Sequence, residues 1–183
     1  MSEDQRDMLT TPVGVAKYCH ITTPDTRFNE DGEYKVDLVL NMDDKDAADF
    51  VENITNMTTQ VGPKANIPVE PELDDDGNPT GNYIAKFRSK FQPKVFDSHN
   101  NPINVTKEND ADGFPREDFV RVGFGTTMRI ATRPKAYKVG STSGVKLYLQ
   151  AVQVHTLVTP PISGGSSWGF TSEEAPEDDA LPL

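Results

Sequence analysis

The sequence is poor in the residues that build covalent or metal-bound frameworks. Its 183 residues include one cysteine, Cys19, and three isolated histidines. An internal disulfide is therefore excluded, and no histidine–cysteine spacing typical of zinc sites is present. The segment after Met1 is polar and charged and has no apolar region of the kind that defines a secretory signal. We therefore expect a protein of a reducing cytoplasm.

Long apolar runs and catalytic motifs are missing as well. No stretch approaches the roughly 18 to 20 apolar residues that cross a bilayer, so no membrane partner is expected. The glycine pair in 123–127 lacks the third glycine of a dinucleotide-binding loop, and no nucleophile lies at a recognisable spacing from a base. The acidic run 74–78 is read as a turn, because Ala85 stands where a calcium loop needs its bidentate glutamate. The sequence thus predicts no enzyme, no cofactor and no metal site.

Charge is sorted along the chain. The net charge of -11 argues on average against a nucleic-acid partner. Residues 119–158, however, carry six Lys and Arg and no Asp or Glu, and residues 82–107 carry five bases and one acid. Residues 159–183 carry five acids and no base. The acid is expected in loops, in one helix and in the tail, and the basic zones are expected in strands.

Alternation of apolar and polar residues predicts strands over 13–22, 33–40, 83–91, 120–132 and 145–158. The inward faces of two of these strands are Tyr83, Ala85, Phe87 and Phe91, and Val145, Leu147, Leu149 and Ala151. Phe87 and Phe91 are expected in the core rather than as stacking surfaces. A short hairpin is expected between 94–96 and 103–105.

One helix is predicted, from a cap at Asp43 or Asp44 to about Gln60, because apolar residues recur there at helical spacing. Residues 62–81 hold four prolines and are expected to form a long loop without core residues. The acidic segment 108–118 is expected to be a second loop, and a Pro-, Gly- and Ser-containing segment is expected to link the last two strands.

Five or six strands, one helix in an early connection and no βαβ alternation favour an all-β fold. A small β-barrel of the OB-fold type over 1–158 is the simplest candidate. Residues 159–183 are expected to form a flexible, disordered acidic tail, because they hold too little apolar surface to fold.

The late strands combine cations with aromatic rings, the mixture that single-stranded nucleic acid requires for its phosphates and its bases. A solvated barrel face is the alternative, and the lack of acid in 119–158 counts against it. The candidate DNA-binding residues are Lys86, Arg88, Lys90, Arg129, Arg133, Lys135, Tyr137, Lys138, Lys146 and Tyr148.

The tail offers a second candidate site. Its acids are suited to occupy the basic groove when DNA is absent, and its apolar residues are suited to dock on a partner; an inert solubilising tail is the alternative. The candidate residues are Trp168, Phe170, Glu173, Glu174, Glu177, Asp178, Asp179, Leu181 and Leu183.

Two stretches, GEYKVDLVL at 32–40 and GFGTTMRIATRPKAYKVGSTSGVKLYLQAVQVHTL at 123–157, resemble the single-stranded DNA-binding proteins that tailed bacteriophages encode for replication, recombination and repair. The resemblance implies an OB-fold, sequence-independent coating and protection of single-stranded DNA, homodimers, and the host cytoplasm. It also implies that the acidic tail competes with DNA and recruits replication proteins such as polymerase and helicase or primase.

The Pro-x-x-Tyr-Lys hairpin of that family nominates Arg133, Lys135, Tyr137 and Lys138, and strand position nominates Lys86, Arg88, Lys146 and Tyr148. The chain departs from the family at its end, Asp-Asp-Ala-Leu-Pro-Leu, where family tails often finish on an aromatic residue. A structural or assembly protein of a virion remains the alternative, since a barrel with a flexible tail would also serve it.

Overall fold

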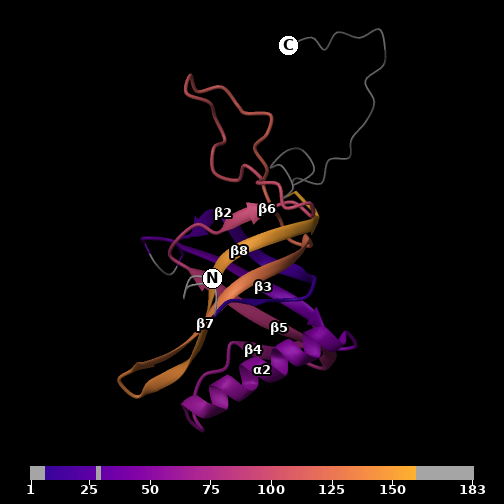
Figure 1. The fold of residues 1–183 in the computed structure, drawn as a ribbon, viewed down its shortest axis with the longest axis vertical. Helices are drawn as coiled ribbons and strands as arrows, with labels where there is room; N and C mark the ends of the chain where they lie inside the picture. The colour runs from indigo at the N-terminus through magenta and orange to yellow at the C-terminus, as the bar shows by residue number, and fades with distance from the viewer. Residues whose placement is uncertain (1–6, 28–29, 160–183) are drawn as a thin grey trace.

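The computed structural model describes residues 7–27 and 30–159 (Figure 1). Its elements, in chain order, are β1 (Leu9–Thr10), β2 (Gly14–Asp25), β3 (Glu33–Asn41), α2 (Lys45–Val61), β4 (Val69–Leu73), β5 (Pro79–Ser89), β6 (Lys94–Phe96), β7 (Thr127–Val139) and β8 (Thr142–Thr156). No helix in this part of the chain has the length and apolar content that would let it span a membrane. The predicted tail residues, from Trp168 to Leu183, lie outside the described residues.

Five of the strands close into a barrel. β3 pairs antiparallel with β2 on one side and with β5 on the other. β5 then pairs with β8 in parallel, β8 pairs antiparallel with β7, and β7 returns to β2. A five-stranded barrel with this mixture of pairings is an OB-fold, so the predicted all-β fold with one helix in a connection is confirmed.

Period-2 alternation fills the barrel. Val36, Leu38 and Leu40 of β3 are fully buried, because alternate side chains of a strand share one face. The helix begins after Asp44, whose side chain caps the backbone N–H of Asp46 as predicted. Phe50 of α2 packs on Phe87 of β5 with ring centroids 6.5 Å apart. Figure 1 shows α2 lying across one end of the barrel, with the segment 97–126 extending from the opposite end.

The prediction of a long coreless loop over 62–81 is wrong. β4 lies within it and pairs with β5, and Val69 is buried in the core. Pro71 is tolerated because β4 pairs, among the described residues, only with β5, so its missing N–H interrupts no second ladder. The proline content concealed an edge strand.

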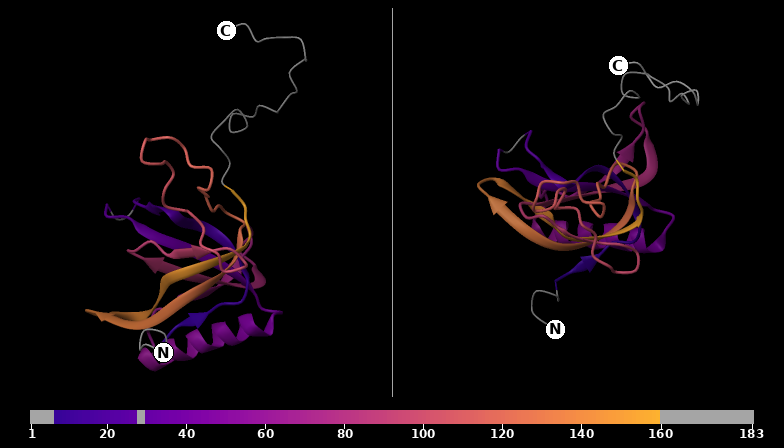
Figure 2. Two further views of the ribbon diagram at one scale, coloured as in Figure 1. Left: turned by 45° about the horizontal axis from the view of Figure 1, so that its top comes forward. Right: turned by 90° about the horizontal axis from the view of Figure 1, so that it is seen from above.

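The last two strands are shifted from their predicted positions. β7 begins at Thr127 rather than 120 and continues through the predicted linker to Val139. The turn lies at Gly140, which has a φ of 60° that suits glycine, and β8 begins at Thr142. The end of this hairpin projects from the barrel (Figure 2). The residues at this end are mostly polar because they extend past the core. The sequence there has no apolar alternation from which a strand could be predicted.

Three smaller predictions are corrected. Phe91 is 82% exposed, because β5 ends at Ser89 and the alternation ends with it. Ala151 is not in the core: the register between β7 and β8 slips at Gln150, so Val152 and Val154 are buried instead. Residues 103–105 do not form a strand; β6 pairs with β8 in parallel, and a single bridge joins Phe96 to Pro102.

Candidate nucleic-acid interface

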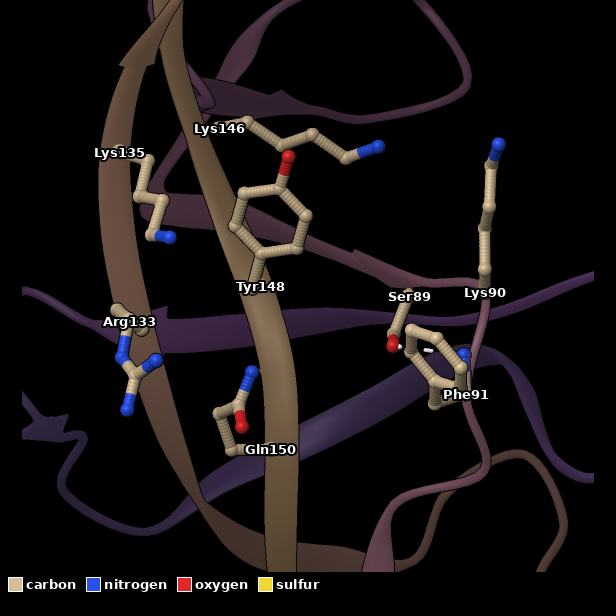
Figure 3. A pocket seen from close by; sticks show the side chains of 8 residues that line it. All are labelled: Ser89, Lys90, Phe91, Arg133, Lys135, Lys146, Tyr148 and Gln150. Atoms are coloured by element: carbon tan, nitrogen blue, oxygen red, sulfur yellow. Dashed lines mark hydrogen bonds between the residues drawn. The ribbon is translucent and has the colours of Figure 1, made fainter. Parts of the chain in front are cut away.

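A groove runs over β5, β7 and β8 and consists of two adjoining cavities. The first, of about 360 Å³, is called the cation cavity (Figure 3). It is lined by Ser89, Lys90, Phe91, Arg133, Lys135, Lys146, Tyr148 and Gln150. The second, of about 530 Å³, is called the apolar cavity. Its lining includes Ile67, Pro68, Lys86, Arg88, Tyr137 and Val139. Lys146 and Tyr148 line both, so the two cavities form one continuous groove.

Strand alternation brings the groove residues to one surface. Arg133, Lys135 and Tyr137 are alternate residues of β7, and Lys146 and Tyr148 are alternate residues of β8. In the hairpin register, Arg133 lies opposite Tyr148 and Lys135 lies opposite Lys146. The intervening residues of β8, Val145 and Leu147, are buried in the core. The packing of the hairpin on the barrel therefore fixes which side chains face the groove.

The Tyr148 ring lies between two ammonium groups. Lys146 Nζ is 5.2 Å from the ring centroid, and Lys135 Nζ is 6.0 Å from it (Figure 3). Both distances lie within the range of cation–π attraction. The ring is thus held between two positive charges while staying part of the groove surface. A flat ring flanked by cations can stack a base and attract the phosphates beside it.

Carboxylates of β3 and β4 neutralise one side of this groove. Lys86 pairs with Glu70 at 2.9 Å, and Arg88 pairs with Asp37 at 3.0 Å. Glu33 lies 3.7 Å from Arg88 and 3.9 Å from Lys146. Most acids were expected in loops, helix and tail, and the few that lie in β3 and β4 are placed by strand pairing beside the basic strands. Within the described part of the chain, no carboxylate pairs with Lys90 or Lys135.

Only two of the predicted DNA-binding residues lie outside the groove. Arg129 lines a separate depression together with Asp46 and Asp49 of α2. Lys138 lines a third depression near Val61, where α2 ends, and does not line the groove. The others are brought together: Lys86, Arg88, Lys90, Arg133, Lys135, Tyr137, Lys146 and Tyr148.

The structure also adds groove residues that the sequence did not suggest. Phe91 lines the cation cavity, and its exposed ring follows directly on Lys90. Asn66 and Ile67 line the apolar cavity although they belong to the segment predicted as a coreless loop. The available signal for Phe91 was the polar Ser89, which interrupts the apolar series of Tyr83, Ala85 and Phe87. No local pattern marks Asn66 or Ile67, because their place depends on long-range pairing with the β7–β8 hairpin.

The fold and the groove together define an OB-type barrel with a basic, aromatic surface. Among the solved structures that share this fold are two bacteriophage proteins. One is gp2.5, a single-stranded DNA binding protein encoded by bacteriophage T7, with 21% identity, a TM-score of 0.59, and coverage of 96% of this chain and 98% of that chain. The other is the single-stranded DNA-binding protein from bacteriophage Enc34 in complex with ssDNA, with 13% identity, a TM-score of 0.62, and coverage of 85% and 90%.

The resemblance to bacteriophage single-stranded DNA-binding proteins, first suggested by 32–40 and 123–157, is thus confirmed at the level of the fold. A C-terminally truncated form of the Enc34 protein matches equally, with 14% identity and a TM-score of 0.62 over 85% of this chain and 89% of that chain. No protein-family model and no curated protein sequence matches the chain.

Proposed function

We propose that the protein binds single-stranded DNA in the groove over β5, β7 and β8, without strong dependence on sequence. The observation that carries the proposal is the Tyr148 ring between Lys135 and Lys146, on a barrel whose solved neighbours include a complex with ssDNA. Single-stranded nucleic acid is bound by cations that follow the phosphates and by rings that stack the bases. The groove supplies both on adjacent strands.

Each part of the groove has a distinct role in this proposal. Lys90 and Lys135, which have no carboxylate partner among the described residues, are available to phosphates at once. Phe91 and Tyr148 line the same cavity and provide two surfaces for stacking. Lys86 and Arg88 must first exchange a carboxylate of β3 or β4 for a phosphate, which weakens their contribution.

The test is a titration of a fluorescently labelled oligonucleotide, read by anisotropy at several salt concentrations. Binding is expected to weaken linearly on a log–log scale as salt rises, with a slope of about -0.7 for each phosphate contacted, because counterions are released from the strand. Duplex DNA of the same length serves as the competitor. Absence of binding to the single strand at low salt contradicts the proposal.

We further propose that this binding coats and protects single strands during phage DNA replication, recombination and repair, and that the protein acts as a homodimer in the host cytoplasm. The acids of the tail from Glu173 to Asp179 would compete with DNA for the groove. Its apolar residues would recruit replication proteins such as polymerase and helicase or primase. The charge contrast between the tail and residues 119–158 supports this role.

Deleting residues 171–183 tests the competition. The truncated protein is expected to bind the same oligonucleotide more tightly than the full chain, and most clearly at low salt, where charge–charge attraction is least screened. Equal affinities and equal salt slopes for the two proteins would contradict competition between tail and DNA, while leaving the groove itself untouched.

A further inference from the structure

The two cavities of the groove differ in how their charges are satisfied. In the apolar cavity, Lys86 and Arg88 are already held by carboxylates at 2.9 and 3.0 Å. A phosphate there must displace a carboxylate that strand pairing holds in place. In the cation cavity, Lys90 and Lys135 meet no such competitor among the described residues. Phosphates are therefore favoured in the cation cavity, and the uncharged base of a nucleotide is favoured in the apolar cavity.

The lining of the apolar cavity suits the faces of a base. Ile67 and Val139 are 42% and 73% exposed, and Pro68 lies beside Ile67. Tyr137 and Tyr148 add two aromatic rings to the same cavity. Covering exposed apolar groups and rings with a flat, weakly polar group is favourable, because apolar surface is removed from water. A nucleobase extending from a backbone bound in the cation cavity has that character.

Asn66 gives this cavity a hydrogen-bonding group. Its Nδ2 donates to the Tyr137 hydroxyl oxygen at 3.3 Å. An asparagine amide has two N–H donors and an acceptor oxygen, so one donor and Oδ1 are left over. The described part of the chain offers neither of them a partner. A donor and an acceptor side by side form the pair that an amide uses to read the edge of a base.

The backbone of Asn66 is fixed on the hairpin. Its N–H donates to the Ser143 carbonyl at 2.8 Å, and its own carbonyl accepts from the N–H of Val145 at 3.1 Å. Gly144 makes this approach possible, since a Cβ at that position would lie 2.9 Å from both the Asn66 Cβ and the Tyr137 hydroxyl. The amide is thus positioned by two backbone hydrogen bonds and one side-chain hydrogen bond before any ligand arrives.

We propose that the apolar cavity is a base subsite, in which Asn66 hydrogen-bonds the edge of one nucleobase and gives the protein a base preference. This inference rests on the proposed binding of single-stranded DNA and deepens it. Adenine is the expected base, because an asparagine amide pairs with it bidentately: Oδ1 accepts from the exocyclic amine, and Nδ2 donates to a ring nitrogen. Asn66 is then a specificity-determining residue on a surface that otherwise tolerates any sequence.

The experiment compares dissociation constants for labelled dA, dC and dT homopolymers of equal length, measured by anisotropy at one salt concentration. The wild-type protein is expected to bind dA about 5-fold or more tightly than dT, the lower range for one bidentate pair. Asn66→Ala is expected to remove most of that ratio while keeping the salt slope. Asn109→Ala, at an exposed position of the segment 97–126, is the matched control and should keep the wild-type ratio.

A second variant guards against a folding defect in the first. Tyr137→Phe keeps the ring and removes the hydroxyl that holds the amide, so the dA-to-dT ratio should fall although stacking is retained. Equal wild-type affinities for the three homopolymers, a ratio unchanged in both variants, or a uniform loss for all three bases would overturn the inference. Wild-type protein that binds no homopolymer at all would instead overturn the proposed function, so the two failures are distinguishable.

Discussion

Lys135 and Lys146 lie directly opposite each other on β7 and β8, and their ammonium groups flank the ring of Tyr148. Like charges at directly opposite positions of a sheet are destabilising. Glu33, 3.9 Å from Lys146, offsets one of the two charges only in part, and Lys135 has no such partner in the described part of the chain. A sheet that keeps this arrangement is suited to an anion near the two lysines, and in the proposed complex a phosphate of the single strand would take that position.

Replacing Lys135 should therefore separate stability from binding. Lys135→Gln is expected to change the free energy of unfolding by less than about 1 kcal/mol, because it removes both the cross-strand repulsion and the cation–π contact with Tyr148, which oppose each other. The same change should weaken binding to single-stranded DNA and lower the salt slope by about 0.7, the share of one phosphate contact. Urea unfolding and salt-dependent anisotropy measure the two effects. Lys64→Gln, an exposed cation away from the groove, should change neither.

Phe91 should contribute to binding without contributing to the fold. Its ring is 82% exposed, so Phe91→Ala is expected to leave the unfolding midpoint unchanged. If the ring stacks a base, the variant should lose about 1 to 3 kcal/mol of binding free energy. Phe114→Ala is the matched control, because Phe114 is also exposed, at 67%, but lies outside the groove. Equal effects of the two changes on affinity would remove Phe91 from the binding surface.

Tyr148 should behave as a stacking residue whose hydroxyl is dispensable. Tyr148→Ala removes the ring between the two lysines and should cost about 1 to 3 kcal/mol of binding free energy. Tyr148→Phe keeps the ring and the cation–π contacts, so its affinity should stay close to that of the wild type. A loss as large in the phenylalanine variant would assign the effect to the hydroxyl and contradict stacking.

Glu33 is expected to compete with phosphates for Arg88 and Lys146 in the proposed complex. It contacts Arg88 and Lys146 at 3.7 and 3.9 Å, and all three side chains are partly exposed. Glu33→Gln should tighten binding to single-stranded DNA by up to about 5-fold at low salt, which corresponds to the energy of a partly exposed ion pair. The gain should be smaller at high salt, where charges are screened. Glu117→Gln removes the same charge from the segment 97–126 and serves as the control. Unchanged affinity in Glu33→Gln would show that the phosphates do not displace this carboxylate.

The sequence predicted the barrel because the strands that carry it are half-buried and alternate. Val36, Leu38 and Leu40 are fully buried at a spacing of two, and the cap at Asp44 marks the helix start. The prediction of strands from the sequence failed where a strand extends beyond the core. Lys135 to Val139 extend β7 beyond the barrel, and Val69 belongs to an edge strand beside Pro71, so neither segment has the apolar pattern of a strand.

The cations of the groove were predictable for a related reason. Lys86 and Arg88, like Lys146 and Tyr148, take the outward positions of strands whose inward positions are plainly apolar. Their neutralisation was not predictable, because the contacts of Glu33, Asp37 and Glu70 depend on which strands become neighbours. A count of charges along the sequence does not show which of them become neighbours in the folded protein.

Cys19 should be unreactive in the folded protein. Burial raises the pKa of its thiol to about 12, so almost no thiolate is present at neutral pH. A thiol reagent such as Ellman's reagent is expected to label it only after unfolding in denaturant. Rapid labelling of the native protein would show that β2 opens locally around this residue.

Asp25 should make stability depend on pH in the acid range. Its carboxylate accepts hydrogen bonds from the Arg27 guanidinium and pairs with Lys35, which holds the pKa of this carboxyl well below its usual value. Because the folded state binds the proton less readily than the unfolded state, this contribution to stability is complete above the unfolded pKa of about 3.9 and is lost as pH falls below it.

Asp25→Asn should therefore unfold at a lower urea concentration than the wild type at pH 7, and the difference between the two unfolding midpoints should narrow only below about pH 4. Asp43→Asn, at the exposed start of the helix, should show no such narrowing. A wild-type advantage that persists unchanged at pH 3 would mean that Asp25 acts through packing rather than through its charge.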